Sequence, residues 1–454
     1  MIQQFINRER ELGFLEKLYA EGRPHFLVLY GRRRVGKTDL ALRFAGKKPS
    51  IYFLAEKSTD AVNMKNMSDL LADFLKDDVF RKAEFESWTD MFEQFSKRVP
   101  GRFVLTIDEF PFLIESNKAI PSVFQKIWDL FLSKTPVFLI LIGSSISMME
   151  TEVLGGKSPL YGRRTAQWKL LPFGYAEVKK FFPGYTGEQL METYAVLDGI
   201  PHYLRQFDKA VPPSQNIREQ IFTKGRMLNE EAEVLLKEEM REPRFYFSIL
   251  HAIASGSSRF GEIANATGLE KTLVSKYLDT LHHLHIIEKV FPVTVKNPKS
   301  RDTLYEISDN YFRFYFRFIH PNKGVLEKTS LLPGFEKDFK QYLGKAFEKV
   351  CMQFLSSLNE RGGLPFRFKR MGRWWEKGRE IDILCIGEDK VLLCEVKWSS
   401  LNKRDLMRVW DGLREKGEGI GKNKEKYFCI IAKKAEKISL DNTLIFDVKD
   451  IYGA

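Results

Sequence analysis

Short apolar runs alternate with amphipathic segments along the first third of the chain. The apolar runs are nearly uninterrupted and cover residues 26–30, 51–54, 103–107 and 137–142. Runs of this kind are typical of strands buried on both faces, as in a parallel sheet covered by helices. Apolar residues at helical spacing lie between them, for example at 62–75 and 122–132. The pattern predicts a doubly wound α/β domain over residues 1–172.

The pattern changes three times after this domain. Residues 173–240 are mostly helical in pattern, with breaks at Gly199 and at the prolines 212–213. Residues 241–328 hold three short helical patterns and then two strand-like runs, which is typical of a winged helix-turn-helix. Residues 329–454 return to mixed α/β. We therefore expect four domains.

Composition places the chain among folded proteins. Hydrophobic residues make up 44% and charged residues 29% of its 454 positions, which excludes a largely disordered chain. The apolar runs are much shorter than the roughly 20 residues of a membrane helix. Charges near the N-terminus interrupt the apolar core that a secretory signal needs. The cysteines lack C-x-x-C spacing and read as buried thiols: Cys351, Cys385, Cys394 and Cys429. We therefore expect a cytoplasmic protein with no membrane partner.

Basic residues outnumber acidic ones by 72 to 60, which gives a formal charge of +12. The sequence pI is about 9.2. A basic protein suits a polyanionic partner such as DNA. An excess this small, spread over 454 residues, is equally compatible with no such partner. Charge alone therefore does not decide the question.

A complete phosphate-binding loop follows the first apolar run. Residues 31–38 match G-x-x-x-x-G-K-[ST], and a helical pattern begins at Asp39. The two glycines let consecutive N–H groups turn inward around a phosphate chain, and the helix start adds a positive dipole end. We expect Lys37 to reach the β and γ phosphates and the hydroxyl of Thr38 to bind Mg²⁺. The predicted ATP-binding residues here are Gly31, Arg32, Arg33, Arg34, Val35, Gly36, Lys37, Thr38 and Asp39.

Two acids end the third apolar run, at Asp108 and Glu109. The carboxyl end of a strand is where open α/β sheets bind ligands. We expect Asp108 to hold Mg²⁺ through water and Glu109 to polarise the water that attacks the γ phosphate. The hydroxyls of Ser144 and Ser145 follow the fourth run, where they either sense the γ phosphate or form a plain turn.

Three segments together resemble the archaeal-type AAA+/STAND-related ATPases. They are Phe5-x-x-Arg8-Glu9-x-Glu11-Leu12, the phosphate loop itself, and Ser158-Pro-Leu-Tyr-Gly-Arg163-Arg164. The resemblance implies that Arg8 lies by the adenine. It also implies that Arg163 or Arg164 senses phosphate in its own site or in a neighbour's; each could instead form a surface ion pair. A homo-oligomer is therefore left open.

The same resemblance extends to Asp198-Gly-Ile-Pro-His-Tyr-Leu204, which is similar to a motif in the helical lid of that family. The family usually has glycine where this chain has Asp198. The resemblance implies that residues 173–240 form a lid over the nucleotide.

The third helical pattern of the predicted winged helix has one polar face. That face carries Lys271, Thr272, Ser275 and Lys276. A helix in this position enters the major groove of DNA in many proteins. Winged helices also act as spacers between proteins, so contact with DNA is one of two alternatives here.

Three acids and a lysine form the candidate site of the last domain: Glu348, Asp382, Glu395 and Lys397. Asp382 and Glu395 fall on two strand patterns joined by a hairpin, and Glu348 falls on a preceding amphipathic helix. Carboxylates placed so can hold one or two Mg²⁺ ions, and the lysine can stabilise charge on a phosphodiester. The arrangement resembles the restriction-endonuclease-like, PD-(D/E)xK nuclease fold. The resemblance implies that Asp382 and Glu395 are metal ligands, Glu348 an accessory ligand and Lys397 the catalytic lysine.

One departure from that nuclease pattern is Ile381, where proline is usual. Basic and aromatic residues surround the predicted site, including Arg373, Trp374, Trp375 and the run from Lys422 to Lys426. Such residues suit phosphates and unpaired bases, although the tryptophans could instead cover a sheet face.

Two functions follow from these predictions. The leading one is an ATPase that acts on DNA as an ATP-gated, Mg²⁺-dependent nuclease or DNA-processing factor. The alternative is a STAND-like nucleotide switch that binds DNA or a protein partner and does not cut.

Overall fold

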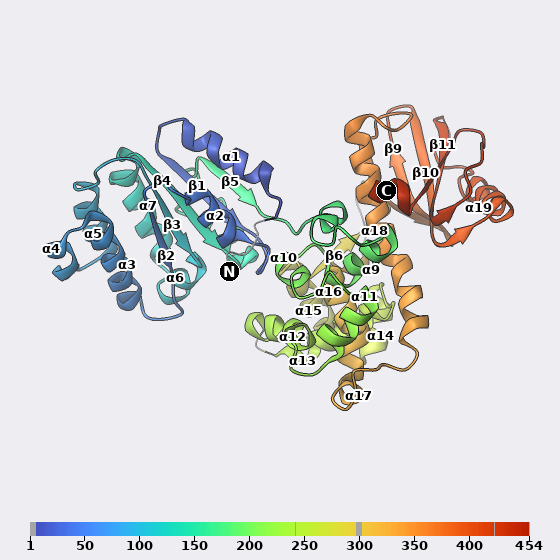
Figure 1. Ribbon diagram of the computed structural model, residues 1–454, viewed down its shortest axis with the longest axis horizontal. Helices are drawn as coiled ribbons and strands as arrows, with labels where there is room; N and C mark the ends of the chain where they lie inside the picture. Colours follow the sequence, from blue (N-terminus) through green and yellow to red (C-terminus); the bar gives the residue numbers. More distant parts are fainter. Residues whose placement is uncertain (1–5, 241, 297–301, 422, 454) are drawn as a thin grey trace. The chain divides into compact units, whose positions relative to one another are not determined.

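The computed structural model describes residues 6–240, 242–296, 302–421 and 423–453 (Figure 1). The chain forms two compact units, Met1–Pro172 and Phe173–Ala454. Phe5, Lys422 and the predicted domain boundary at residue 241 lie outside the described residues. Within the described residues, each helix is too short or too polar to cross a membrane.

The core of the first unit is a five-stranded sheet in the order β2-β3-β4-β1-β5. All four strand pairs are parallel. The strands are β1 (His25–Tyr30), β2 (Ser50–Leu54), β3 (Phe103–Asp108), β4 (Val137–Gly143) and β5 (Ala166–Lys169). The predicted α/β domain with a buried parallel sheet is confirmed.

Alternate residues of the strands face two separate cores. On β1, Phe26 and Val28 face one core, while Leu27 and Leu29 face the other. Helices α1 (Glu9–Ala20) and α2 (Lys37–Ala45) cover the second core. The first is covered by α3 (Asp60–Leu75), α5 (Trp88–Ser96), α6 (Phe110–Ser116) and α7 (Ile120–Leu130) (Figure 1). Short helices complete the unit: α4 (Asp78–Lys82), η1 (Leu132–Lys134), α8 (Ile146–Met148) and η2 (Met149–Val153).

The second unit begins with helices, as the pattern predicted. They are η3 (Tyr175–Lys180), α9 (Gly187–Leu197), α10 (Pro201–Leu204), α11 (Pro213–Asn216), η4 (Ile217–Phe222) and α12 (Met227–Glu239). A capping box at Thr186 and Gln189 starts α9.

A sharp turn joins α9 to α10 at Asp198 and Gly199. Asp198 has a φ of 54°, in a region where an L-residue is strained. Its buried carboxylate accepts hydrogen bonds of 2.8 Å from the backbone N–H groups of Gly199 and Asn310. These bonds tie the turn to α16 (Asn310–Phe314) and offset the strain. They give a physical reason for an aspartate where the resemblance leads one to expect glycine.

Gly199→Ala is expected to destabilise the second unit by about 3 kcal/mol or more. A Cβ at this position would lie 1.8 Å from the carbonyl oxygen of Phe173, which is backbone and cannot swing aside. Equilibrium unfolding in denaturant measures the effect. Gly344→Ala is the matched control, because Gly344 lies within a helix with no neighbour within 4 Å of the added carbon. A Gly199→Ala protein as stable as this control would contradict the prediction.

Three helices and a small sheet follow. They are α13 (Pro243–Ala254), α14 (Phe260–Thr267), α15 (Lys271–His283), and the antiparallel pair β6 (Ile287–Val290) and β7 (Leu304–Ile307). The chain continues through α16, η6 (Tyr315–Ile319), η7 (His320–Asn322) and α17 (Lys323–Leu326) into the 27-residue helix α18 (Phe335–Arg361).

The last part is a mixed five-stranded sheet in the order β12-β11-β10-β9-β8. Strands β8 (Arg370–Glu376), β9 (Arg379–Ile386) and β10 (Lys390–Leu401) pair antiparallel. Strands β10, β11 (Glu425–Ala435) and β12 (Thr443–Asp447) pair parallel. Helix α18 packs on β10 through the rings of Phe347 and Trp398, and α19 (Lys403–Lys416) and α20 (Val448–Tyr452) complete the fold. The four cysteines are buried free thiols, as predicted.

Candidate functional site

The loop between β1 and α2 has the backbone that a phosphate cradle requires. Gly31, Arg34 and Gly36 have φ values of 152°, 67° and 91°. A Cβ on Gly31 would lie 2.3 Å from the carbonyl oxygen of Leu170, so only glycine fits there. Gly36 precedes α2 and brings no side chain to cap its first N–H groups. These groups remain available to an anion.

Lys37 lies folded within this loop and is almost fully buried. Its ammonium group donates to the carbonyl oxygens of Gly31 at 2.9 Å and Arg32 at 2.8 Å. Burial lowers the pKa of Lys37 to about 8, and the charges of Glu109 and Asp108 oppose that shift. The negative charges of a phosphate chain in the loop would raise the pKa of Lys37 again and favour its charged form.

Asp108 stands at the centre of a hydrogen-bond network at the end of β3. Its Oδ2 atom accepts from the hydroxyl of Thr38 at 2.6 Å and from that of Tyr52 at 2.9 Å. Hydroxyl and carboxylate oxygens are the donor types that Mg²⁺ prefers, so these residues fit that ion. Thr38 and Asp108 therefore lie together as predicted, although 70 residues separate them.

Tyr52 was not among the predicted residues. Burial, followed by the charge of Asp108, raises the pKa of the Tyr52 phenol, so the phenol stays protonated and donates a hydrogen bond to Asp108. The signal that could have found Tyr52 in the sequence is a phenol in the middle of strand β2, which pairs in parallel with β3.

Glu109 is held close to Asp108 in a left-handed backbone conformation, with a φ of 50°. Its N–H donates to Oδ1 of Asp108 at 2.8 Å. The hydroxyl of Ser144, which follows β4, donates to Oε2 of Glu109 at 2.8 Å. The serine therefore orients this carboxylate, a role that differs from the two that the sequence suggested.

Arg8 connects three segments around the loop. Its buried guanidinium donates to the carbonyl oxygens of Val35 at 3.1 Å and Leu171 at 2.8 Å, and to Glu11 at 2.9 Å. These bonds hold the loop against the chain that follows β5. The predicted contact of Arg8 with adenine stays a prediction.

The two candidate phosphate-sensing arginines have different surroundings. Arg163 forms an ion pair of 3.1 Å with Asp129 on α7. Arg164 donates to Gln167 at 2.7 Å and lies 5.3 Å from the ring centre of Tyr161. One nitrogen of Arg164, Nη1, is buried without a hydrogen-bond partner in the described part of the chain. Arg164 therefore has a donor to offer, whereas Arg163 is in the surface pair considered above.

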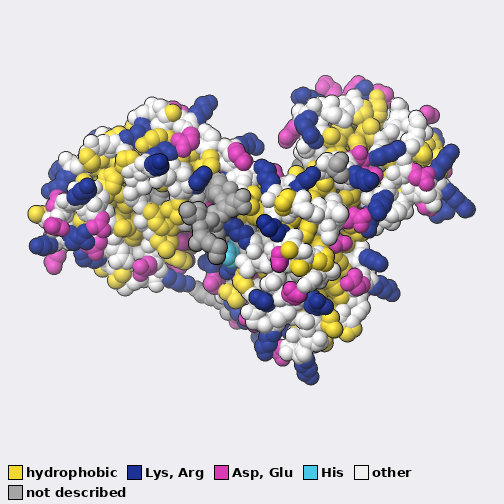
Figure 2. Space-filling model, in the orientation of Figure 1, with side chains coloured by type: hydrophobic (Ala, Val, Ile, Leu, Met, Phe, Trp, Pro, Cys, Tyr) yellow, Lys and Arg dark blue, Asp and Glu magenta, His cyan; other side chains and the backbone are white. Residues whose placement is uncertain are grey.

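The polar face predicted for the third helix of the middle segment is exposed on α15. Lys271, Thr272, Ser275 and Lys276 are all exposed, while Val274 and Leu278 are buried. This face is free to contact a ligand. Over the visible face of the molecule, Lys and Arg side chains are scattered among acidic ones (Figure 2).

The candidate acids of the last sheet lie where β10 separates from β9. The β9–β10 pairing ends at Ile383 and Cys394, while β10 remains paired with β11 beyond that point. Asp382 fills the gap, since its Oδ2 atom accepts from the N–H of Val396 at 2.7 Å. A carboxylate thus occupies the place of a ladder hydrogen bond, next to Glu395.

Lys397 and Glu395 share one face of β10 and contact each other at 2.7 Å. Burial acts to lower the pKa of Lys397, but the hydrogen bond to Glu395 and the charges of Glu395 and Asp382 outweigh it and raise that pKa. The lysine is therefore an ammonium ion at neutral pH. It suits the stabilisation of negative charge and does not suit the role of a base.

Two further lysines contact carboxylates of this cluster. Lys416, at the end of α19, lies 3.1 Å and 3.0 Å from the two oxygens of Glu395. Glu348 accepts from Lys345 at 2.8 Å. Nowhere in the described ranges is a group of three or more His, Cys, Asp or Glu side chains arranged so that it could hold a metal ion.

The predicted three-carboxylate set of Glu348, Asp382 and Glu395 is thus not assembled as one ligand group in the described part of the chain, and lysines engage two of its members. Mg²⁺ commonly binds one or two protein carboxylates together with substrate phosphates. Asp382 and Glu395 fit that smaller donor set.

The pH dependence of stability provides a test of this cluster. Burial, with the charges of Glu395 and Glu348, raises the pKa of Asp382 from 3.8 to about 6. The folded state then binds more protons than the unfolded state between these values, so stability falls as pH rises through them. We expect the wild type to lose on the order of 1–3 kcal/mol more than Asp382→Asn between pH 4 and pH 7, measured by denaturant unfolding in EDTA. Equal losses in the two proteins would contradict the raised pKa.

The two tryptophans before Asp382 differ in exposure. Trp374 is buried in the core beside Ile381 and Leu384, so its ring mainly covers the sheet. Trp375 is partly exposed and, with Lys377, lines a cavity of about 670 Å³. Both tryptophans border this cavity, and Trp375 is the more exposed of the two.

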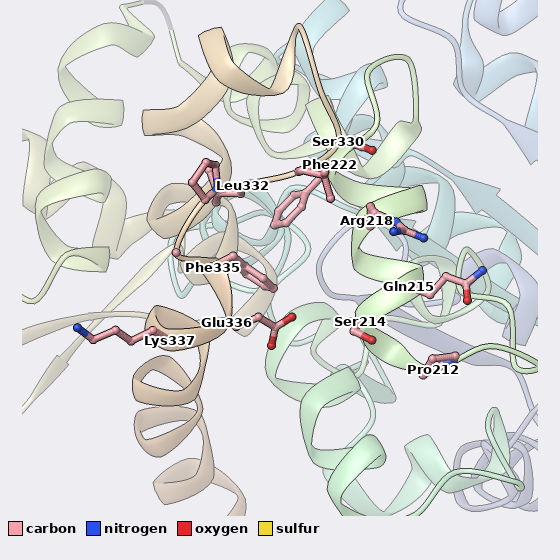
Figure 3. A pocket seen from close by; sticks show the side chains of 13 residues that line it. Pro212, Ser214, Gln215, Arg218, Phe222, Ser330, Leu332, Phe335, Glu336 and Lys337 are labelled. Carbon is pink, nitrogen blue, oxygen red and sulfur yellow. The ribbon is translucent and has the colours of Figure 1, made fainter.

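A further groove of about 820 Å³ lies away from all predicted site residues. Figure 3 shows Phe222 on η4 and Phe335 at the start of α18 within it, and their rings are 5.0 Å apart. Its lining is mainly apolar, with Arg218, Glu336 and Lys337 at its edge. Sequence reasoning gave no indication of it.

Comparison with known proteins places the chain in a family. Residues 5–207 match an ATPase domain predominantly from Archaea. Residues 315–409 match archaeal and bacterial proteins of unknown function. The Walker-type ATPase of Pyrococcus abyssi has a similar fold, with a TM-score of 0.51 and 22% identity over 69% of this chain and 97% of that one.

Two relatives come from Methanocaldococcus jannaschii. An uncharacterized ATP-binding protein is 49% identical over 47 residues, which are 10% of this chain and 80% of that protein. A second, uncharacterized protein is 37% identical over 450 residues, which are 98% of this chain and 99% of that protein. The chain therefore belongs to the family of that full-length relative, as a protein with an archaeal-type P-loop ATPase domain.

Proposed function

We propose that this ATPase acts on DNA, and that nucleotide bound at the phosphate loop controls a Mg²⁺-dependent nuclease centre in the last domain. The observation that carries the proposal is the pairing of Glu395 with Lys397 beside Asp382, where β10 separates from β9. Acids and a protonated lysine together suit phosphodiester cleavage.

In the ATPase domain, the loop N–H groups and Lys37 would hold the phosphates, and Arg164 would supply a further cation. Thr38 and Asp108 would hold Mg²⁺, which neutralises charge on the β and γ phosphates. Glu109, oriented by Ser144, would take a proton from the attacking water. Tyr52 keeps Asp108 in place through its hydroxyl.

The middle of the chain supplies the proposed DNA contact. Helices α13 to α15 with β6 and β7 have the order of a winged helix, and α15 exposes Lys271 and Lys276. We propose that this face contacts DNA, with the lysines on phosphates. Residues 173–240 are proposed to serve as the helical lid.

In the nuclease centre, Asp382 and Glu395 would hold Mg²⁺, which polarises the phosphodiester and lowers the pKa of a bound water. Lys397 would stabilise the charge that develops on the phosphate oxygens. Lys416 must leave Glu395, at least in part, for this carboxylate to serve as a ligand.

That last requirement favours a second candidate function. Lys416 and Lys397 already neutralise Glu395, as a metal ion would otherwise do. A STAND-like switch that binds DNA or a protein partner without cutting it needs no metal in this place. The two functions differ in a single activity.

The experiment compares cutting and binding in one preparation. Supercoiled plasmid and a short duplex are incubated with protein, Mg²⁺ or Mn²⁺, and ATP, ADP or no nucleotide. The proposal predicts nicking or linearisation that requires metal and changes with the nucleotide. Nucleotide-dependent binding of the duplex without cutting in any metal supports the switch. Neither cutting nor binding of DNA in any state would contradict the proposal, and it would also contradict a switch that binds DNA.

A further inference from the structure

A cavity of about 350 Å³ opens in the second unit between the end of α13, β7, η6 and α18. Its size is in the range of small-ligand sites. Its wall contains two acids, Glu306 and Asp338, and four cations, which are Arg313, Arg317, Lys345 and Arg373. The wall thus has more positive than negative groups.

The acids do not neutralise all of these cations. Glu306 accepts from Arg373 at 2.5 Å and lies 3.7 Å from Lys345. Arg313 donates to the carbonyl oxygen of Ile307 at 3.1 Å, and it has no ion pair in the described part of the chain. Arg317 has neither a hydrogen bond nor an ion pair among the described residues. Two guanidinium charges therefore face the cavity without a carboxylate in contact.

The two arginines are four residues apart on consecutive helical turns, so they project from one side of α16 and η6. Serine hydroxyls at Ser255 and Ser258 and the amide of Gln341 add hydrogen-bonding groups to the wall. Guanidinium groups match the oxygens of phosphate in geometry as well as in charge. We propose that this cavity binds a phosphoryl group, supplied by a nucleic-acid backbone or by a free nucleotide.

The cavity adjoins the candidate nuclease centre. Lys345 and Arg373, which line it, also reach Glu348, at 2.8 Å and 3.9 Å. A phosphoryl group bound here would therefore lie beside the carboxylate cluster. A role of this phosphoryl group in cutting rests on the proposed function. Binding in the cavity does not, because it requires no cutting.

Arg317 gives the sharpest test, since its side chain makes no hydrogen bond or ion pair with the described residues. Arg317→Gln, Arg317→Lys and the control Arg404→Gln are compared with wild type, each also combined with Lys37→Ala to weaken binding at the phosphate loop. Arg404 is exposed on α19 and lies outside the cavity. Calorimetry measures the affinity for inorganic phosphate and for AMP. A 20-nucleotide single strand is titrated at several salt concentrations, and thermal unfolding checks the fold.

The proposal predicts at least a 10-fold loss of affinity in Arg317→Gln, a smaller loss in Arg317→Lys, and none in Arg404→Gln. A loss for phosphate and AMP alone identifies a free nucleotide as the source. A loss for the single strand, with a salt slope lower by about one, identifies the nucleic-acid backbone. Equal affinities in Arg317→Gln and wild type for every probe, or no binding of any probe, would overturn it. Cutting activity plays no part in these outcomes.

Discussion

Lys37→Ala is expected to lower the turnover number of ATP hydrolysis by at least about 100-fold. The ammonium group lies within the loop, 2.9 Å and 2.8 Å from two of its carbonyl oxygens. Removing it takes away a preorganised cation that stabilises the transferring phosphoryl group. Loss of one such group typically slows the reaction by about 10²- to 10³-fold. Steady-state phosphate release measures the effect.

Lys47→Ala is the matched control for this variant, because Lys47 follows α2 and is exposed. It should hydrolyse ATP like wild type. Thermal unfolding of both variants separates a lost cation from a lost fold. A folded Lys37→Ala protein that retains more than half of the wild-type rate would contradict the role given to this lysine.

Lys397→Ala is expected to lower metal-dependent DNA cutting by about 100-fold or more and to leave ATP hydrolysis unchanged. The lysine is protonated and lies against Glu395. Its loss removes the positive charge that would stabilise the negative charge developing on the phosphodiester. The assay follows plasmid nicking and phosphate release in the same samples. The separation of the two activities is as important as the size of either.

Lys403→Ala serves as control, because Lys403 starts α19 on the surface and its side chain makes no hydrogen bond or ion pair with the described residues. If Lys397→Ala cuts as fast as Lys403→Ala, the cutting does not come from this centre. If both variants and the wild type bind DNA but fail to cut it, the switch function is favoured.

The phosphate loop was predictable because its chemistry depends on neighbours in sequence. Gly31 to Gly36 form the loop, Lys37 and Thr38 begin α2, and the strand before the loop is buried throughout. Asp108 was also predictable, since parallel strands bring their carboxyl ends to one edge of the sheet. The structure adds the bond between Thr38 and Asp108 that this rule implies.

Contacts made by long side chains across the fold were not predictable in the same way. Arg8 bonds to the carbonyl of Leu171, 163 residues away, and no local pattern encodes that pair. Lys416 reaches Glu395 from the end of an amphipathic helix, where a lysine is also an ordinary surface residue. The second lysine is what separates the nuclease hypothesis from the switch hypothesis, so sequence reasoning stopped short of that distinction.

The sequence also did not predict where the carboxylate of Asp382 lies within the sheet. The strands bearing Asp382 and Glu395 were predicted, but the point where β10 leaves β9 depends on the side chain of Asp382 taking the N–H of Val396. The burial of Trp374 was likewise not predictable, because two consecutive tryptophans in a sequence do not show which ring faces the core.

Titration calorimetry with ATP in the presence of Mg²⁺ tests the central claim most directly, namely that the backbone cradle from Gly31 to Thr38 holds a triphosphate. The account predicts one ATP per chain for wild type, and markedly weaker binding for Gly31→Ala, whose added carbon would lie 2.3 Å from the Leu170 carbonyl. Folded wild-type protein that shows no heat of binding at millimolar ATP, at two temperatures, would contradict it.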